Sequence, residues 1–222
     1  MPPTSGEIPP CPLSVVAVPI ATRVALRDVN RVIDEGILPA AFLSAENGRR
    51  VWATACTLIS FYYESAGQLT SEERLNMIRW AEPRLSKWKT LTLASLAKKD
   101  WTMRHDFLTI DLAPFVERTA ESLSNLEAAR ALVSSSPDVL GATPVIEGTR
   151  IPVYDVAASV AAGHSLDEIL EAYPALDERR VGLAKVYADA NPLRGRPKPV
   201  NELPTGATVI TDRRVPRRRK AV

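Results

Sequence analysis

Residues 137–153, with the sequence P-D-V-L-G-A-T-P-V-I-E-G-T-R-I-P-V, restrict the chain more strongly than any other stretch of similar length. Gly141 and Gly148 permit backbone angles that are closed to other residues. Pro144 and Pro152 fix φ and remove two backbone N–H donors. Glycines and prolines in this alternation predict tight turns joined by very short extended segments.

Two short apolar runs, Val145-Ile146 and 151–153, flank Glu147-Gly148-Thr149, and this pattern predicts a small hairpin with Gly148 at positive φ. Arg150 directly follows the turn. It either clamps the hairpin to nearby helix carbonyls or binds an anion together with backbone N–H groups of the turn. The residues expected to build this turn are Gly141, Gly148, Thr149, Arg150 and Pro152.

Three helical patterns follow the predicted hairpin. The first runs from Tyr154 to Ala162, Ser165 caps the second and Asp177 caps the third, which stops at Asn191-Pro192. The G-T-R-I-P-V core, the upstream P-D-V and P-V-I, and the later I-L and Y-P pairs together resemble the "domain of unknown function" family numbered four-thirty-three. The resemblance extends from Leu132 to Pro197, with Ala142 at a position where glycine is expected.

That resemblance carries functional expectations. The family occurs alone and at the C-terminus of larger chains in bacterial toxin–antitoxin operons, and those chains look like VapB-class antitoxins of PIN-domain ribonucleases. It implies an antitoxin that neutralises a PIN-domain ribonuclease toxin and binds operator DNA to repress its own operon. The expected assembly is a homodimer or a toxin–antitoxin hetero-oligomer.

Near the N-terminus, residues 25–39 predict an amphipathic helix that Thr22 could cap and that ends at Gly36 and Pro39. Its apolar face contains Leu26, Val29, Val32 and Ile33. Four polar residues lie largely off that face: Arg23, Arg27, Asn30 and Arg31. Arginine and asparagine are the residue types that pair with guanine and adenine edges, and we expect these four to contact DNA.

Asn47-Gly48 is a strong hairpin signal, and Arg49 and Arg50 follow it. A hairpin after a recognition-type helix is typical of the wing of a winged helix, with Arg49 and Arg50 on DNA phosphates. The sequence R-D-V-N-R-V-I-D-E-G-I-L-P and the later G-R-R are similar to the N-terminal module of VapB-like antitoxins. However, residues 15–21, split by Pro19, predict a poor first helix. The alternative is a surface helix whose arginines are only solvated.

The remaining segments predict a mainly α fold with small β-hairpins. We expect a buried helix over residues 53–67, a helix capped by Thr70 and ending at Pro83, a strand over 107–111 and a long helix over 113–134. The predicted organisation is a flexible arm (1–14), a winged-helix-like module with supporting helices (15–112), a linking helix (113–134), a homeodomain-like hairpin and trihelix (135–192) and a basic disordered tail (193–222).

Charge is distributed unevenly along the chain. From Leu193 onward there are nine Lys or Arg and two acids, a net charge of +7, and because the whole chain carries +2 the preceding part carries −5. Such a tail favours either nucleic acid or an acidic pocket on a partner protein. The residues expected to meet the toxin are Arg194, Arg196, Val209, Ile210, Arg213, Arg214, Arg217, Arg218 and Arg219. The resemblance implies that these arginines enter the magnesium-binding carboxylate cluster of a PIN active site.

No pattern in the sequence predicts catalysis, a metal site or a cofactor. His105 and His164 have no ligand-type residue at suitable spacing, and Cys11 and Cys56 form no C-x-x-C motif. No apolar run approaches the roughly 20 residues of a membrane span, and no export signal is evident, so we expect a cytoplasmic protein. Two alternatives to the antitoxin stay open: a DNA-binding regulator without a toxin partner, and a protein-interaction module.

Overall fold

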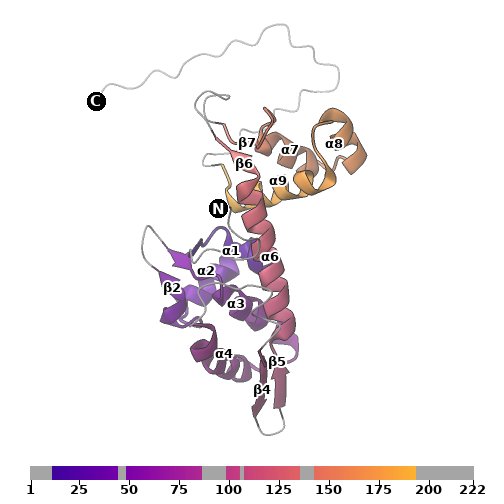
Figure 1. The fold of residues 1–222 in the computed structure, drawn as a ribbon. Coiled ribbons are helices and arrows are strands. Elements are labelled where there is room, and N and C mark those ends of the chain that lie inside the picture. The colour runs from indigo at the N-terminus through magenta and orange to yellow at the C-terminus, as the bar shows by residue number, and fades with distance from the viewer. Residues whose placement is uncertain (1–11, 45–48, 87–98, 106–107, 136–142, 194–222) are drawn as a thin grey trace, which may run out of the picture. The chain divides into compact units, whose positions relative to one another are not determined.

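The computed structural model describes residues 12–44, 49–86, 99–105, 108–135 and 143–193, and these form a mainly helical protein with small antiparallel strand pairs (Figure 1). The helices are α1 (Val18–Thr22), α2 (Leu26–Asp34), η1 (Ala40–Phe42), α3 (Ala55–Glu64), η2 (Ser65–Gly67), α4 (Ser71–Leu85), α6 (Ala113–Ala131), α7 (Val153–Ala161), α8 (Leu166–Ala172) and α9 (Glu178–Ala190). The strands are β1 (Leu13–Ser14), β2 (Leu43–Ser44), β3 (Arg50–Val51), β4 (Thr102–His105), β5 (Leu108–Asp111), β6 (Val133–Ser134) and β7 (Val145–Ile146). The predicted mainly α class with small β-hairpins is confirmed.

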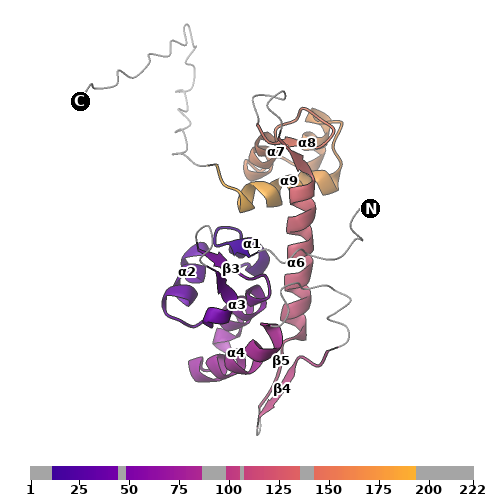
Figure 2. The same cartoon turned by 60° about the vertical axis from the view of Figure 1, so that its left-hand side comes forward.

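The larger hydrophobic core lies among α1, α2, α3, α4 and α6. Helix α3 is its centre, because every residue from Ala55 to Phe61 is buried, as the uniformly apolar sequence predicts. Helix α6 runs alongside α1 and α3, which both views show (Figures 1 and 2). The ring of Phe115 in α6 meets Phe61 edge-on, with ring centroids 5.5 Å apart.

A second, smaller core holds the C-terminal helices together. Ile146, Val153, Val156, Ile169 and Val181 are buried in it, and they come from β7, α7, α8 and α9. Helix α9 packs against both α7 and α6. Its last residue, Ala190, is buried in the larger core. The chain up to Pro192 therefore forms one compact unit.

Capping residues define several helix ends as the sequence predicts. The Thr70 and Ser165 hydroxyls each accept a hydrogen bond from the backbone N–H three residues later. The glutamate at that later position in turn accepts from the backbone N–H of the capping residue. Helices α4 and α8 therefore both begin with a capping box. The Asp177 carboxylate accepts from the backbone N–H of Arg180 at the start of α9. Helix α4 continues past Pro83 to Leu85, whereas the sequence predicted an end at the proline.

The region before α2 differs from the sequence prediction. Pro19 does not disrupt a helix, because it lies in the first turn of α1, where a missing N–H costs nothing. Helix α1 begins at Val18, and the strand β1 lies earlier, at Leu13–Ser14, within the segment assigned to the arm. Residues 1–11 lie outside the described part of the chain.

Two further predictions are wrong in detail. Helix α6 ends at Ala131, and Val133–Ser134 form β6, which pairs with β7 in antiparallel register. The second arm of the predicted hairpin is not a strand. Pro152 makes only an isolated bridge to Val145, and Val153 already begins α7 because Pro152 acts as its N-cap.

Candidate nucleic-acid interface

Helices α1 and α2 are joined by a turn whose first residue, Arg23, has positive φ (+58°). The Arg23 backbone N–H donates to Pro19 O over 2.7 Å, so this residue closes the C-terminus of α1. The left-handed region normally favours glycine or asparagine. Thr22 does not cap α2 as predicted: its hydroxyl donates to Val18 O and accepts from Val24 N–H, which shapes the same turn.

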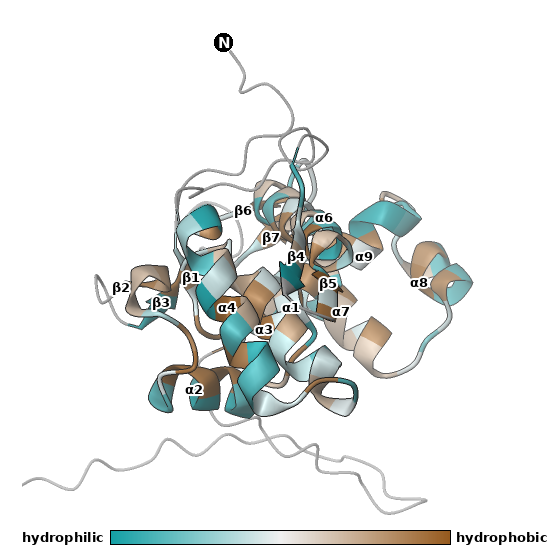
Figure 3. Ribbon diagram, turned by 90° about the horizontal axis from the view of Figure 1, so that it is seen from below, coloured by the Kyte–Doolittle hydropathy of each residue, from teal (hydrophilic) through white to brown (hydrophobic). Residues whose placement is uncertain are grey.

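One face of α2 is fixed against the larger core. Val29 and Val32 are buried, and Figure 3 shows hydrophobic and hydrophilic residues on the same short helix. The Tyr63 hydroxyl of α3 donates to Asp28 O over 2.9 Å. Burial, and then the nearby Asp28 carboxylate, raise the pKa of Tyr63, which favours the protonated donor. Helix α2 thus has a defined rotation about its axis.

The opposite side of α2 is open. The Arg27 and Arg31 side chains are 88% and 65% exposed. Leu26, expected on the apolar face, is 41% exposed at the start of the helix. The N-cap of α2 is Ala25 and not Thr22. Arg31 is hydrogen-bonded to Glu35 over 2.7 Å, and this bond raises the pKa of the guanidinium. Arg27 lies 3.6 Å from the Asp28 carboxylate.

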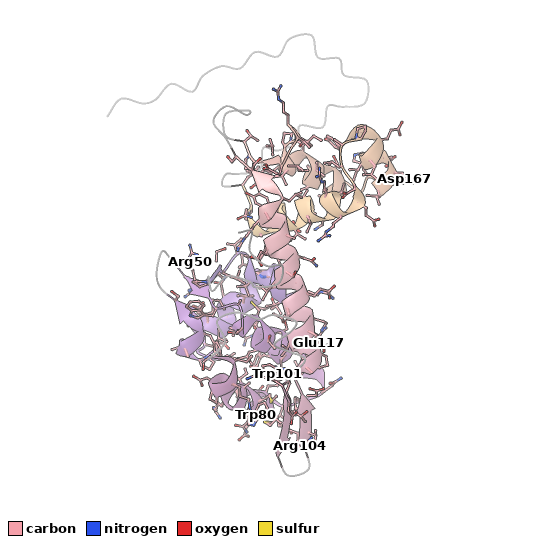
Figure 4. All side chains as sticks on the ribbon, in the orientation of Figure 1. Arg50, Trp80, Trp101, Arg104, Glu117 and Asp167 are labelled. Atoms are coloured by element: carbon pink, nitrogen blue, oxygen red, sulfur yellow. The ribbon has the colours of Figure 1, made fainter. Side chains whose placement is uncertain are left out.

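A three-stranded antiparallel sheet has the order β1-β3-β2, with β1 before α1 in the chain and the other two strands after α2. Leu43 pairs with Val51, and Ser44 pairs with Arg50. Arg50, marked in Figure 4, is half-buried and donates to the backbone carbonyl oxygen of Pro12 over 3.2 Å, which connects β3 to the segment before β1. The predicted Asn47-Gly48 turn lies outside the described residues.

Arg49, just before β3, connects the sheet to α2. One guanidinium nitrogen donates to Asp34 Oδ1 over 2.6 Å and the other to Asn30 Oδ1 over 3.3 Å. The Asn30 amide nitrogen donates to Leu26 O within α2. The six residues predicted to contact DNA are therefore gathered on the α1–α2 turn, the exposed side of α2 and the adjacent strand. Asp34 and Tyr63, which position them, were not predicted, because no local pattern indicates their long-range contacts.

Arg23 also lines a small hollow beside the α1–α2 turn. The other polar groups around this hollow include Thr22, Ser60 and the ion pair between Arg118 and Glu64, which are 2.7 Å apart. Because Glu64 already neutralises Arg118, the hollow offers little excess positive charge beyond Arg23 itself.

In the C-terminal helical region, the predicted turn is present. Gly148 has φ +74°, which confirms the expected positive φ. The Thr149 hydroxyl donates to Ile146 O over 2.8 Å and accepts from Ile151 N–H over 3.1 Å. Arg150 is exposed and makes no hydrogen bond or ion pair with another described residue. Gly141 lies outside the described residues.

The comparisons with known proteins bear on this region and on the whole chain. Residues 133–188 match the family model described as Protein of unknown function (DUF433), which confirms the resemblance drawn from the G-T-R-I-P-V core. The chain is also 60% identical over 201 residues to "Uncharacterized protein y4eO" of Sinorhizobium fredii, covering 90% of this chain and 91% of that protein.

The chain belongs to the y4eO family. Because the y4eO match covers most of both chains, the family includes the N-terminal helices as well as the DUF433 region. No solved structure matches the chain.

Three further features concern the described part of this y4eO-family protein: metal-ligand groups, the cysteine thiol and helix length. No group of three or more His, Cys, Asp or Glu residues there is placed to hold a metal ion. Burial raises the pKa of the Cys56 thiol to about 12, so it carries no nucleophilic thiolate at neutral pH. No described helix is long and apolar enough to cross a bilayer. The tail residues predicted to bind a toxin, from Arg194 to Arg219, lie outside the described residues.

Proposed function

We propose that this protein binds duplex DNA, with α2 as the recognition helix of a winged-helix module and the β2–β3 pair as its wing. The proposal rests on the exposed side chains of Arg27 and Arg31, which lie on α2 opposite its buried face. Arg49, next to β3, also binds the side of this helix through Asp34. A helix held in this way can enter a major groove, since the groove is wide enough for one helix.

Each residue of the interface has a distinct role in this proposal. Arg27 and Arg31 reach base edges, where arginine pairs with guanine O6 and N7. The exposed Leu26 offers an apolar contact for a thymine methyl group. We assign phosphate contacts to Arg23, on the turn before α2, and to Arg50 in β3, whose guanidinium also donates to Pro12 O.

Acidic residues on the same surface limit the affinity of one module. Arg23, Arg27, Arg31, Arg49 and Arg50 are accompanied by the acids Asp28, Asp34 and Glu35, so the local net charge is +2. We propose that a homodimer binding two half-sites compensates for this small charge, as symmetric repressors do on palindromic operators.

We further propose that the protein is an antitoxin. The supporting observation is the net charge of +7 after Leu193 in a chain whose remaining part is acidic. A guanidinium from this tail would displace magnesium from the carboxylate cluster of a PIN-domain ribonuclease, because its forked donors suit carboxylates. The DUF433 region would dock elsewhere on the toxin and tether the tail. A regulator without a toxin, or an interaction module, remains the alternative.

Two experiments test the two parts separately. The full chain should be titrated with the duplex upstream of its own gene, and the logarithm of the binding constant should fall linearly with the logarithm of the salt concentration. An equally weak affinity for this duplex and for unrelated duplexes would contradict the DNA role. A chain ending at Pro192 should retain this binding. Without its tail it should lose most of its inhibition of the ribonuclease encoded beside it, and equal inhibition by both forms would contradict the proposed role of the tail.

A further inference from the structure

The side chains of Asn30 and Asp34 lie one helical turn apart on α2, and Arg49 spans both of them. The two terminal nitrogens of its guanidinium bind one residue each, Nη1 to Asn30 at 3.3 Å and Nη2 to Asp34 at 2.6 Å. A planar fork bound at two points has a fixed orientation, whereas a single ion pair can swivel. The contact joins segments that are 15 and 19 residues apart in sequence, so it holds the start of β3 against the side of α2.

Both ends of the Asn30 amide are already engaged within the protein. Its amide oxygen accepts from Arg49 and its amide nitrogen donates to Leu26 O. Bidentate recognition of adenine needs both atoms of the amide. Asn30 therefore belongs to the support of the interface, and the exposed Arg27 and Arg31 are the base-reading side chains.

The energy of the pair supports a role in positioning more than in stability. The Arg49 and Asp34 side chains are both about half exposed, and ion pairs between exposed side chains contribute little to folding. Such a pair adds little to the free energy of unfolding, yet it can fix how β3 and the strands paired with it lie against α2.

We propose that Asp34 is a positioning residue for DNA binding that acts through Arg49, and that its negative charge strengthens binding to DNA. This inference rests on the proposed DNA-binding function. The expected loss of affinity on removing the Asp34 charge is unusual. Removing a carboxylate from a DNA-facing surface ordinarily increases affinity, because it reduces repulsion of the phosphates.

Glu35, the C-cap of α2 and the residue after Asp34, provides a matched control. It carries the same charge and pairs with Arg31, a base-reading residue, over 2.7 Å. Glu35→Gln should therefore raise DNA affinity by about twofold or more, because it releases Arg31 and removes a repulsive charge. Asp34→Asn should lower the affinity by about threefold or more.

The test measures the Kd of the full chain for its upstream duplex, and the exchange of backbone amide hydrogens in β2 and β3 without DNA. Asp34→Asn and the charge-conserving Arg49→Lys should both weaken binding and speed amide exchange, with unchanged melting temperature. In an Arg49→Ala background, Asp34→Asn should cause no further loss.

Tighter binding by Asp34→Asn, or an equal loss with and without Arg49, would overturn the inference while leaving the DNA role intact. Failure of the unmodified protein to bind DNA would instead overturn the proposed function and, with it, the role of Asp34 there. The amide exchange would still report whether the contact holds the sheet.

Discussion

The Tyr63 hydroxyl in α3 donates a hydrogen bond to the backbone carbonyl oxygen of Asp28 in α2, over 2.9 Å. It joins the centre of the larger core to the helix that presents Arg27 and Arg31. Helix α2 has nine residues, which is too short to be stable alone, so its position depends on such tertiary contacts.

Tyr63→Phe should therefore destabilise the protein by about 1 kcal/mol, because the ring still packs but the hydrogen bond is lost. Tyr62→Phe is the control, since it retains a ring under the Arg74 guanidinium, 4.3 Å from the ring centroid. Urea unfolding curves of both variants check this. Equal midpoints for Tyr63→Phe and the unmodified protein would show that the hydrogen bond contributes nothing.

Arg23 occupies a backbone conformation that disfavours side chains, with φ +58°. Arg23→Gly should relieve that cost and stabilise the protein, by about 1 kcal/mol at most once the greater freedom of the unfolded chain is considered. The same change should weaken DNA binding, because it removes a cation from the edge of the interface. In Arg23→Gly the melting temperature should thus rise while the DNA affinity falls. A decrease in both would assign Arg23 a mainly structural role.

Two glycines in the C-terminal region allow a paired test of backbone strain. Gly148 has φ +74° and Gly182 lies inside α9, and an added Cβ would meet no atom within 4 Å at either position. Gly148→Ala should cost about 1–2 kcal/mol, because only the backbone conformation opposes it. Gly182→Ala should stabilise α9 by up to about 1 kcal/mol. Similar melting temperatures for the two variants would contradict this assignment of the turn.

The capping box of α8 predicts a pH dependence of stability. Hydrogen bonds from the Ser165 backbone and side chain, followed by the charge of nearby His164, hold the pKa of Glu168 below its usual range. A carboxyl group whose pKa is lower in the folded state stabilises the protein above its unfolded pKa, and this contribution is lost as the pH falls through the folded pKa.

Glu168→Gln keeps a capping side chain but cannot titrate. The unmodified protein should be the more stable of the two near neutral pH, and the difference in melting temperature should shrink below about pH 4. A difference that stays constant across this range would exclude a contribution from the ionised Glu168.

Local patterns predicted those features that depend on local physics. The uniformly apolar run of α3, the caps Thr70, Ser165 and Asp177, and the positive φ of Gly148 all follow from neighbouring residues. Errors arose where distant contacts decide the structure. Val133–Ser134 extend a helical pattern in sequence, but they leave the helix to pair with Val145–Ile146, a partner whose register no short-range signal reveals.

The candidate interface shows the same division. The placement of Arg27 and Arg31 off the buried face of α2 follows from helical periodicity, and the structure leaves both exposed. The sequence predicts a poor first helix because a proline in a helix interior disrupts it, whereas Pro19 lies in the first turn of α1, where a proline is compatible with a helix. The contacts of Arg49 with Asn30 and Asp34 require the folded arrangement of α2 and β3, so the sequence alone could not predict them.

The central claim is that the exposed side of α2 reads DNA, and the double variant Arg27→Ala/Arg31→Ala tests it most directly. The matched control is Arg79→Ala/Arg179→Ala, which removes the same charge from exposed positions on α4 and α9. The Kd of each form for the upstream duplex and for a scrambled duplex should be measured at matched salt.

We expect the α2 variant to lose about 1–3 kcal/mol for each lost base contact on the upstream duplex, and to bind the two duplexes almost equally. The control should keep its preference for the upstream duplex. Two results for the α2 variant would contradict the claim: a Kd for the upstream duplex equal to that of the unmodified protein, or an equal loss of affinity for the upstream and the scrambled duplex. In either case α2 is not a recognition helix.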